Sequence, residues 1–462
     1  MELERGATFF TRDRNMYKTF FSLLIVIAAQ GIITLAVNLA DNIMLGNFSE
    51  TALAGASVAN QLHFLLQMTA GGVGAGIVVL GAQYWGKGET EPIRKIISVG
   101  VKLSLAFGII FFAATSIAPR GLLSLLTNDP AVIDEGVRYL YIMRFTYLLY
   151  SVSTALIASL QSVQSAIIGT ITASTTILIN VCLNYCLIYG NFGFRRMGIH
   201  GAAIATMTSR IVELVIVLCY IFLRDKKLRI KPADLFRTDF SYIRDFVKVS
   251  LPVCIAGVQW GIAQAVQTAI LGHISESVIA ANAIASIVFM LLATFGMSGA
   301  NAASVTIGKA VGAGEFHKVR PYSRTLQMIF IAMGIVSGAL IFLLKDLAVG
   351  IYAVSPETAK LAGQFLLILS VTTIGSCYEY PVEGGIIAGG GNTKYQSVVD
   401  ISFMWLFTIP FSALSAFVFK FPPTITFCFL KLDQLGKCIP NAIVCNRYRW
   451  VRRLTRETSV ES

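Results

Sequence analysis

Long apolar stretches separated by short polar breaks recur from one end of this sequence to the other. A helix needs about 20 predominantly apolar residues to cross the hydrocarbon core of a bilayer. Hydrophobic residues make up 55% of the chain and charged residues only 13%. The sequence therefore predicts an all-α integral membrane protein with twelve transmembrane helices, near residues 20–45, 52–83, 93–118, 137–160, 165–190, 199–223, 249–272, 278–307, 322–344, 359–388, 395–419 and 421–446.

The last of these spans is the weakest, because Lys431, Asp433 and Lys437 interrupt it. No cleavable signal peptide is apparent before the first span, so we expect that helix to stay in the mature protein. Eight cysteines lie within or close to spans, which gives no disulfide framework.

The basic residues indicate an orientation in the membrane. If the N-terminus is cytoplasmic, the segments on that side hold 25 of the 37 Lys and Arg residues, and the outer loops hold five. Cytoplasmic loops carry an excess of positive charge. We therefore expect a multi-pass protein of the cell membrane with both termini in the cytoplasm, and we attribute the net charge of +12 to topology, with no nucleic acid as a partner.

An internal duplication divides the chain. A shift of 226 residues aligns "LGNFSETALAGASVANQLHFLL", from Leu45, with "LGHISESVIAANAIASIVFMLL", from Leu271, without a gap. Six spans separate equivalent points, so the two halves insert with the same orientation and their symmetry axis runs along the membrane normal. We predict an N-terminal six-helix lobe (1–223), a basic cytoplasmic linker (224–248) and a C-terminal six-helix lobe (249–462).

Polar residues follow a helical repeat in three of the predicted spans. Such stripes face a bundle interior or a watery cavity, because polar side chains are costly in hydrocarbon. They comprise Gln30, Thr34, Asn38 and Asp41 in the first span, Thr172, Thr176, Asn180 and Asn184 in the fifth, and Trp260, Gln264 and Gln267 in the seventh. The seventh-span residues match positions 34, 38 and 41 after the shift of 226.

Two interpretations of Asp41 remain open at this stage. The span ends at Ala40 and the carboxylate reaches the outer headgroups, or the apolar run continues through Leu45 and the carboxylate is buried. A buried carboxylate costs roughly 2.5 to 3.5 kcal/mol on insertion scales, which favours a functional role. The second interpretation predicts a proton-binding switch at Asp41.

Several other charged residues also lie within the predicted spans. Arg210 and Glu213, three residues apart, are expected to form a structural ion pair. Glu379 and Glu383 flank Pro381, and Glu379 is a possible second ion site. Two further residues, Asp400 and Lys394, are interpreted as membrane-interface residues. The hydrolase and metalloprotease motifs sought in the sequence are absent, so neither an enzyme nor a bound metal or cofactor is expected.

Three motifs, together with the six-plus-six arrangement, resemble the MATE (multidrug and toxic compound extrusion) transporters. They are "VNLADNIMLG" in the first span, "LINVCLNYCLIYGNFGF" in the fifth and "GIHGAAIATMTSR" at the start of the sixth. The resemblance implies two lobes flanking a cleft that opens alternately to either side, with export driven by inward flow of H⁺ or Na⁺. Asp41 matches the acidic residue of that family's first helix, and Asn180 matches the asparagine of its fifth.

The sequence also departs from that family. Asn184 stands where many relatives carry a second acid, and the seventh span offers Gln264 and Gln267 in place of the glutamate of the sodium-coupled branch. The ion-coupling group is therefore predicted to be Asp41, Asn180, Asn38 and Asn184, and the substrate cavity Gln30, Thr34, Gln264, Gln267, Trp260 and Thr176.

The resulting hypothesis is a monomeric, cation-coupled exporter of small organic, cationic compounds that works by alternating access. One alternative is a lipid or lipid-linked-sugar flippase of related two-lobed build, which would favour a larger and strongly basic cavity. A second alternative is a membrane receptor or channel without coupling. For that class Asp41→Asn would leave function intact.

Overall fold

The computed structural model describes residues 10–237, 239–352 and 354–456. Over these ranges the regular structure is helical and contains no strand. Eleven helices are long and apolar enough to cross a membrane. A helix satisfies its backbone hydrogen bonds internally, as a lipid environment demands. The predicted all-α membrane architecture is confirmed.

The first half of the chain contains six long helices and one short one. The short helix α4 lies between the third and fourth long helices, and a widened π-helical turn, Tyr220–Arg224, extends the last long helix. The helices are α1 (Arg14–Phe48), α2 (Glu50–Lys87), α3 (Thr90–Ile117), α4 (Pro119–Ser124), α5 (Pro130–Ser162), α6 (Ile167–Tyr189) and α7 (Ile199–Cys219).

The second half begins after a connection that carries the short α8 (Pro232–Phe236). Its long helices are α9 (Phe240–Gly272), α10 (Glu276–Gly312), α11 (Phe316–Gly350) and α12 (Pro356–Tyr380), the last extended by a π-helical segment to Ile387. An eleventh span runs over Thr393–Val418 and includes α13 (Thr393–Phe403) and α14 (Ile409–Ala413).

The twelfth predicted span is helical but broken into three pieces. These are α15 (Pro423–Leu430), α16 (Leu432–Gly436) and α17 (Cys438–Arg447). The breaks fall at Lys431 and Lys437, two of the charged residues that weaken this span in the sequence. No piece alone is long enough to cross a bilayer.

Two compact units make up the chain. One comprises the chain up to Ala28, Val78–Gly88 and the chain from Ile255; the other comprises Ala29–Ile77 and Glu89–Cys254. The unit boundaries thus pass through α1, α2 and α9. The lobe and linker boundaries expected from the sequence stay a prediction.

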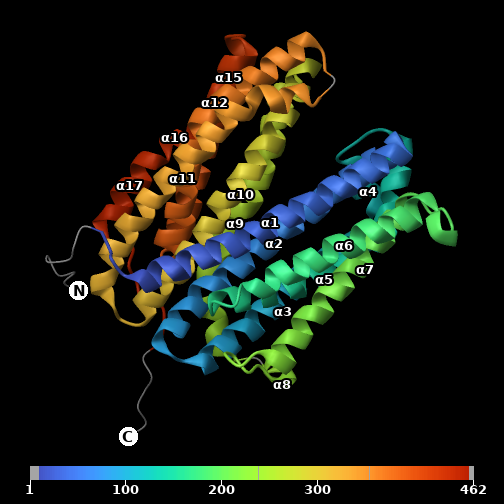
Figure 1. Cartoon of the computed structure of the whole chain (residues 1–462). Coiled ribbons are helices and arrows are strands. Elements are labelled where there is room, and N and C mark those ends of the chain that lie inside the picture. The colour runs from blue at the N-terminus through green and yellow to red at the C-terminus, as the bar shows by residue number, and fades with distance from the viewer. Residues whose placement is uncertain (1–9, 238, 353, 457–462) are drawn as a thin grey trace, which may run out of the picture. The chain divides into compact units, whose positions relative to one another are not determined.

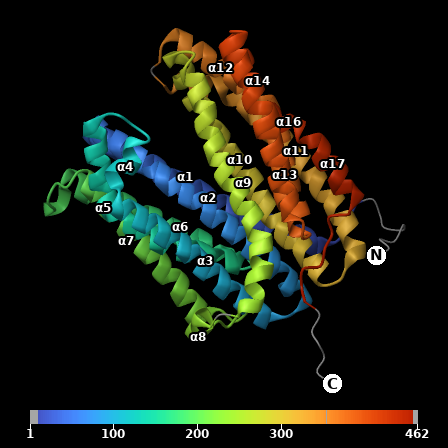
Figure 2. The same cartoon turned by 180° about the vertical axis from the view of Figure 1, so that it is seen from behind.

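Each unit has its own apolar core. In the unit that contains Ala29–Ile77, α5 packs against α3 and α7, and α6 packs against α7, as both views show (Figures 1 and 2). Its core includes Leu66, Tyr147 and Ile188. In the other unit α11 packs along α12 (Figure 1). There the stacked rings of Phe365 and Phe427, 4.0 Å apart, lie in the core.

The C-terminal ends of α2 and α10 cross at a pair of glycines. A Cβ atom at Gly86 would lie 2.0 Å from the carbonyl oxygen of Lys309, and a Cβ atom at Gly312 would lie 1.8 Å from that of Gln83. The two contacts exchange when each residue is shifted by 226, the offset of the duplication. This reciprocity is what a local twofold axis through the crossing produces, and only glycine permits so close an approach.

The segment after α17 runs back over the end of α2. The buried side chain of Gln83 donates to the carbonyl oxygens of Gly389 and Arg452, each at 3.3 Å, and accepts from the backbone N–H of Leu454 at 2.8 Å. The N–H of Arg452 donates to the carbonyl of Gly390 at 2.7 Å. The glycine-rich sequence "AGGGN", residues 388–392, therefore contacts the C-terminal segment.

The chain before α1 is held by α11. The backbone N–H of Thr11 donates to Thr325 Oγ1 at 3.1 Å. The hydroxyl of Tyr322 donates to Asp13, and this hydrogen bond is the main reason why the pKa of Asp13 lies below its ordinary value.

Candidate functional site

Asp41 lies within helix α1, and its carboxylate accepts a hydrogen bond from a buried side-chain amide. α1 continues to Phe48, seven residues beyond Asp41. Asn184 on α6 donates from Nδ2 to Asp41 Oδ1 at 2.5 Å, and Asn184 itself is fully buried. The structure thus places Asp41 against the interior of its unit, in the arrangement that the buried interpretation of the sequence requires.

A chain of hydrogen-bonded polar side chains extends from Asp41 on α1 to α6 and α7. Asn184 also donates to Asn180 Oδ1 at 3.1 Å, one turn earlier on α6. Asn180 donates to Thr206 Oγ1 on α7 at 3.4 Å. Direct hydrogen bonds therefore link Asp41 on α1 to side chains on α6 and α7. The buried side chain of Tyr139 on α5 lies in the core of the same unit.

A buried ion pair lies beside this chain on α7. Arg210 Nη1 is 2.7 Å from Glu213 Oε2, and Ser153 on α5 donates to the other carboxylate oxygen at 2.6 Å. The expectation of a pair at these two positions is confirmed. Arg210 also interacts electrostatically with Asp41, although its direct partner is Glu213. The guanidinium lies over the ring of Tyr150, 5.2 Å from its centroid.

The other polar residues predicted on the first helix lie in different surroundings. Gln30 is half-buried against Gly169 on α6, where a Cβ atom would lie 2.3 Å from its Oε1. Thr34 donates to the carbonyl of Gln30 at 2.9 Å. Asn38 is exposed, and among the described residues it has no hydrogen bond with Asp41 or Asn180. The structure thus brings Asp41, Asn180 and Asn184 together, but not Asn38.

The remaining predicted cavity residues lie on α6 and α9. Thr176 is buried and donates to the carbonyl of Ala173 at 2.9 Å. Gln267 is buried, with its amide nitrogen 3.3 Å from the sulfur of Met404. Trp260 and Gln264 are half-buried. The α6 and α9 residues belong to different compact units.

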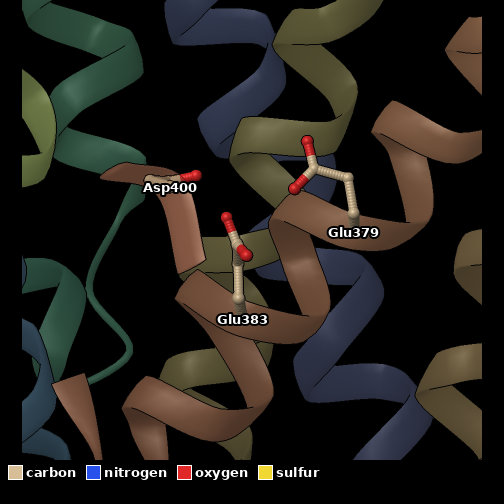
Figure 3. Close-up of side chains that lie close together, drawn as sticks. All are labelled: Glu379, Glu383 and Asp400. Atoms are coloured by element: carbon tan, nitrogen blue, oxygen red, sulfur yellow. The ribbon is translucent and has the colours of Figure 1, made fainter. Parts of the chain in front are cut away.

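A second charged cluster lies in the other unit. Glu379 on α12, Glu383 on the π-helical continuation of α12 and Asp400 on α13 direct their carboxylates toward one another (Figure 3). One oxygen from each lies within 4.8 Å of the others. The ammonium group of Lys437, between α16 and α17, lies 2.8 Å from Asp400 and 3.2 Å from Glu379.

This cluster corrects two sequence-based interpretations. Asp400 was expected at the membrane interface, but it packs inward and pairs with Lys437, 37 residues further along the chain. From the sequence, Lys437 is interpreted only as a charged residue that interrupts the twelfth span. The pairing of Lys437 with Asp400 depends on the break between α16 and α17, and no local sequence pattern predicts it. Lys394, in contrast, is exposed.

Thr206 accepts a hydrogen bond from Asn180 but is not among the residues identified from the sequence. Thr206 precedes Arg210 by one helical turn, so a polar stripe on α7 was available as a signal. Tyr139 reads as an ordinary aromatic residue in an apolar helix. The structure places it in the core, where α5 packs against α7.

The model of one protein family matches most of this chain. The MatE family model matches residues 27–186 and 252–414. These two segments correspond to the duplicated halves, and the first contains Asp41, Asn180 and Asn184. The second contains Glu379, Glu383 and Asp400.

Two relatives carry related names. The "probable multidrug resistance protein NorM" of Listeria monocytogenes is 24% identical over 399 residues, which cover 85% of this chain and 86% of the relative. The protein of the same name from Thermotoga maritima is 23% identical over 430 residues, covering 91% and 87% respectively.

Solved structures share the fold. A MATE protein crystallised in complex with MaL6 superposes with a TM-score of 0.85 and 18% identity, over 97% of each chain. The eukaryotic MATE transporter AtDTX14 gives a TM-score of 0.84 and 17% identity, over 95% of this chain and 97% of the other. At this level of identity the likeness extends to the twelve-helix, two-lobed fold alone.

Proposed function

Because this chain belongs to the MatE family, we propose that it is a multidrug exporter that couples the outward movement of small organic compounds to the inward movement of a cation at Asp41. The transport cycle is alternating access, in which the binding sites open in turn to each side of the membrane. The names of the relatives from Listeria and Thermotoga support the substrate class.

The observation that carries this proposal is the unbalanced charge of Asp41. Arg210, which interacts electrostatically with it, is already paired with Glu213 at 2.7 Å. Among the described residues Asp41 has no salt bridge of its own. An ionised carboxylate that is held inside a membrane protein without a counter-ion provides a site for a cation from solution.

We propose that this cation is H⁺. The atom that Asn184 presents to Asp41 is its amide nitrogen, a donor, whereas Na⁺ would need oxygen atoms around it. A proton on Asp41 removes the negative charge that Asn184 and Arg210 face. The hydrogen bonds through Asn180 and Thr206 then rearrange, and α1 moves relative to α6 and α7. Sodium remains the alternative that the experiment below separates.

The gradients available set the power of such an exchange. A membrane potential supplies about 2.3 kcal/mol per charge per 100 mV, and a pH difference supplies about 1.4 kcal/mol per unit. One proton could therefore hold a neutral compound at a gradient of tens- to hundreds-fold. For a monovalent cationic compound, one-for-one exchange cancels the voltage contribution.

The remaining expectations complete the proposal. The protein acts as a monomer in the cell membrane with both termini in the cytoplasm, and its substrates are organic cations. The neutral side chains of Gln30, Thr34, Thr176, Trp260, Gln264 and Gln267 are proposed to contact them. Glu379 is proposed to form part of a second cation site, whose position is taken by the ammonium group of Lys437, 3.2 Å from its carboxylate.

Transport in inverted membrane vesicles tests the proposal. Vesicles that contain the native chain should accumulate a fluorescent organic cation when the lumen is acidic, and the Asp41→Asn variant should not. Asp346→Asn is the matched control, because Asp346 is exposed and, among the described residues, pairs only with Lys345. An imposed Na⁺ gradient without a pH gradient separates the two ions.

Three results would count against the proposal. Equal accumulation by the native chain and the Asp41→Asn variant would remove the coupling role of Asp41. Accumulation driven by Na⁺ alone would replace the proton by sodium. Movement of fluorescent lipid between leaflets without transport of organic cations would favour the flippase alternative.

A further inference from the structure

Four carboxylates surround one ammonium group in the unit that contains α10 to α17. Lys437 Nζ lies 2.8 Å from Asp400, 3.2 Å from Glu379, 3.7 Å from Asp433 and 4.0 Å from Glu383. The ammonium group therefore lies among carboxylates from α12 and its π-helical continuation, from α13 and from α16. This is the position that a bound cation would take.

Burial makes this cluster unusual. Glu383 is fully buried, and Glu379 and Lys437 are 4% and 6% exposed. The four carboxylates carry three more negative charges than one ammonium group can balance when all are ionised. Removing charges from water costs several kcal/mol per ion, so a cluster of this composition persists only if cations or protons complete it.

A second observation points to a ligand. Glu383 Oε2 accepts a hydrogen bond from Asn441 at 3.0 Å, but Glu383 Oε1 has no hydrogen-bond partner among the described residues. Its carboxylate points toward Asp400 and Glu379 (Figure 3). The Lys437 ammonium is the only described cation near this oxygen, at 4.0 Å. One buried oxygen thus faces the cluster without a direct donor.

The spacing of the oxygens matches that of a metal site. One oxygen each from Glu379, Glu383 and Asp400 lies within 4.8 Å of the others. Oxygen ligands stand about 2.3 to 2.6 Å from Ca²⁺, so two ligands of one ion are at most about twice that distance apart. Asp433 offers a fourth carboxylate on the adjacent α16.

We propose that Lys437 is a built-in cation that occupies a carboxylate-lined cation site formed by Glu379, Glu383 and Asp400, and that it excludes metal ions from this half of the protein. Without the ammonium group the same oxygens bind a hard cation such as Ca²⁺. Exchange with ions in solution is then left to Asp41. The inference concerns the occupancy of the cluster and does not require that Asp41 carries the coupling proton.

The break in the last helix supports this assignment. Lys437 is the residue between α16 and α17, and Asp433 is one turn before it on α16. Asn441, one turn after it on α17, binds Glu383 and accepts a hydrogen bond from Tyr395. The broken helix therefore presents the cation and a carboxylate ligand together to α12 and α13.

Calcium binding to the purified chain tests the proposal. We expect the native protein in detergent to bind no Ca²⁺ at this site in equilibrium dialysis, and the Lys437→Met variant to bind one additional Ca²⁺ per chain. Lys394→Met is the control for loss of one positive charge, since Lys394 is exposed near the start of α13. Adding Glu383→Gln to Lys437→Met should abolish the additional binding.

A variant with fewer unbalanced charges covers the case in which Lys437→Met does not fold. Glu379→Gln/Lys437→Met removes one charge of each sign and keeps Glu383, Asp400 and Asp433, and Ca²⁺ should raise its melting temperature. The proposal is overturned if neither variant gains Ca²⁺ binding over the Lys394→Met control. It is also overturned if the native chain binds Ca²⁺ and Glu383→Gln removes that binding.

Discussion

Asn184 donates its side-chain amide to Asp41 across 143 residues of sequence, and this contact joins α6 to α1. The acceptor is a carboxylate about two turns before the end of α1, and the donor is fully buried. A hydrogen bond to a charged group contributes about 1.5 to 3 kcal/mol. The pair therefore stabilises the ionised form of Asp41.

Replacement of Asn184 should change how readily Asp41 binds its cation. Asn184→Leu removes the donor and keeps an apolar side chain of similar size. The loss of this hydrogen bond destabilises the ionised carboxylate more than the neutral carboxyl group. Half-maximal transport should therefore be reached at an H⁺ concentration that is lower by up to about tenfold. Uptake by inverted vesicles over a series of luminal pH values measures the shift.

The matched control for Asn184→Leu is Asn191→Leu, at a half-buried residue after α6 whose side chain, among the described residues, donates only to the backbone carbonyl of Tyr185. It should leave the pH dependence unchanged. An unaltered pH dependence in Asn184→Leu as well would mean that this hydrogen bond does not govern cation binding.

The ion pair on α7 should control the charge that Asp41 faces. Glu213→Gln frees Arg210 to pair with Asp41, which then keeps its negative charge and stops exchanging. Breaking a buried ion pair costs roughly 3 to 5 kcal/mol, so a lower melting temperature accompanies the loss of transport. Both quantities are measured on the same preparation.

The double variant Arg210→Met/Glu213→Gln separates the two effects. It removes both charges and leaves Asp41 without a competing cation. We expect it to recover most of the stability and part of the transport. Transport by Glu213→Gln at the native rate would exclude a link between the pair and Asp41.

The crossing of α2 and α10 should tolerate no side chain. In Gly86→Ala the new Cβ atom would lie 2.0 Å from the carbonyl oxygen of Lys309. This oxygen belongs to the helix backbone, so it cannot move aside as the end of a flexible side chain can. Overpacking of this kind costs about 1 to 3 kcal/mol. Melting temperatures of the purified variants measure the loss.

Gly71→Ala is the control on the same helix. A Cβ atom there meets nothing within 4 Å, so alanine should be neutral or stabilising by up to about 1 kcal/mol through its higher helix propensity. The reciprocal variant Gly312→Ala should behave as Gly86→Ala does. Equal stability of all three variants would contradict the close approach.

Hydrogen–deuterium exchange of backbone amides should show whether the hydrogen bonds of Gln83 fix the C-terminal segment. Gln83→Leu removes the acceptor of the Leu454 N–H and the donor to the carbonyls of Gly389 and Arg452. Deuterium uptake should therefore rise at Leu454 and its neighbours. Uptake within the core of α5 should stay unchanged, and an unaltered rate at Leu454 would show that other contacts hold the segment.

Much of this architecture is readable from the sequence, because the dominant signals are local. Apolar length predicts the spans, and the shift of 226 residues predicts the repeat that the Gly86–Lys309 and Gly312–Gln83 contacts display. Helical periodicity places Asp41, Asn180 and Asn184 on interior faces, and the structure brings these three together.

The sequence does not predict partners that depend on packing between distant helices. Asn38 shares the periodicity of Asp41 but is exposed. Asp400 resembles an interface residue until α16 and α17 bring Lys437 beside it. Helical periodicity indicates one face of a helix, but it does not indicate which neighbour covers that face or where a span such as the twelfth breaks.

Proton movement by the purified native chain in liposomes tests the central claim most directly. Addition of an organic cation on one side should drive protons toward that side, as a pH-sensitive dye trapped in the lumen reports. Asp41→Asn should bind the same compound and move no protons. Proton movement by Asp41→Asn equal to that of the native chain would contradict the assignment of Asp41 as the site where the cation binds.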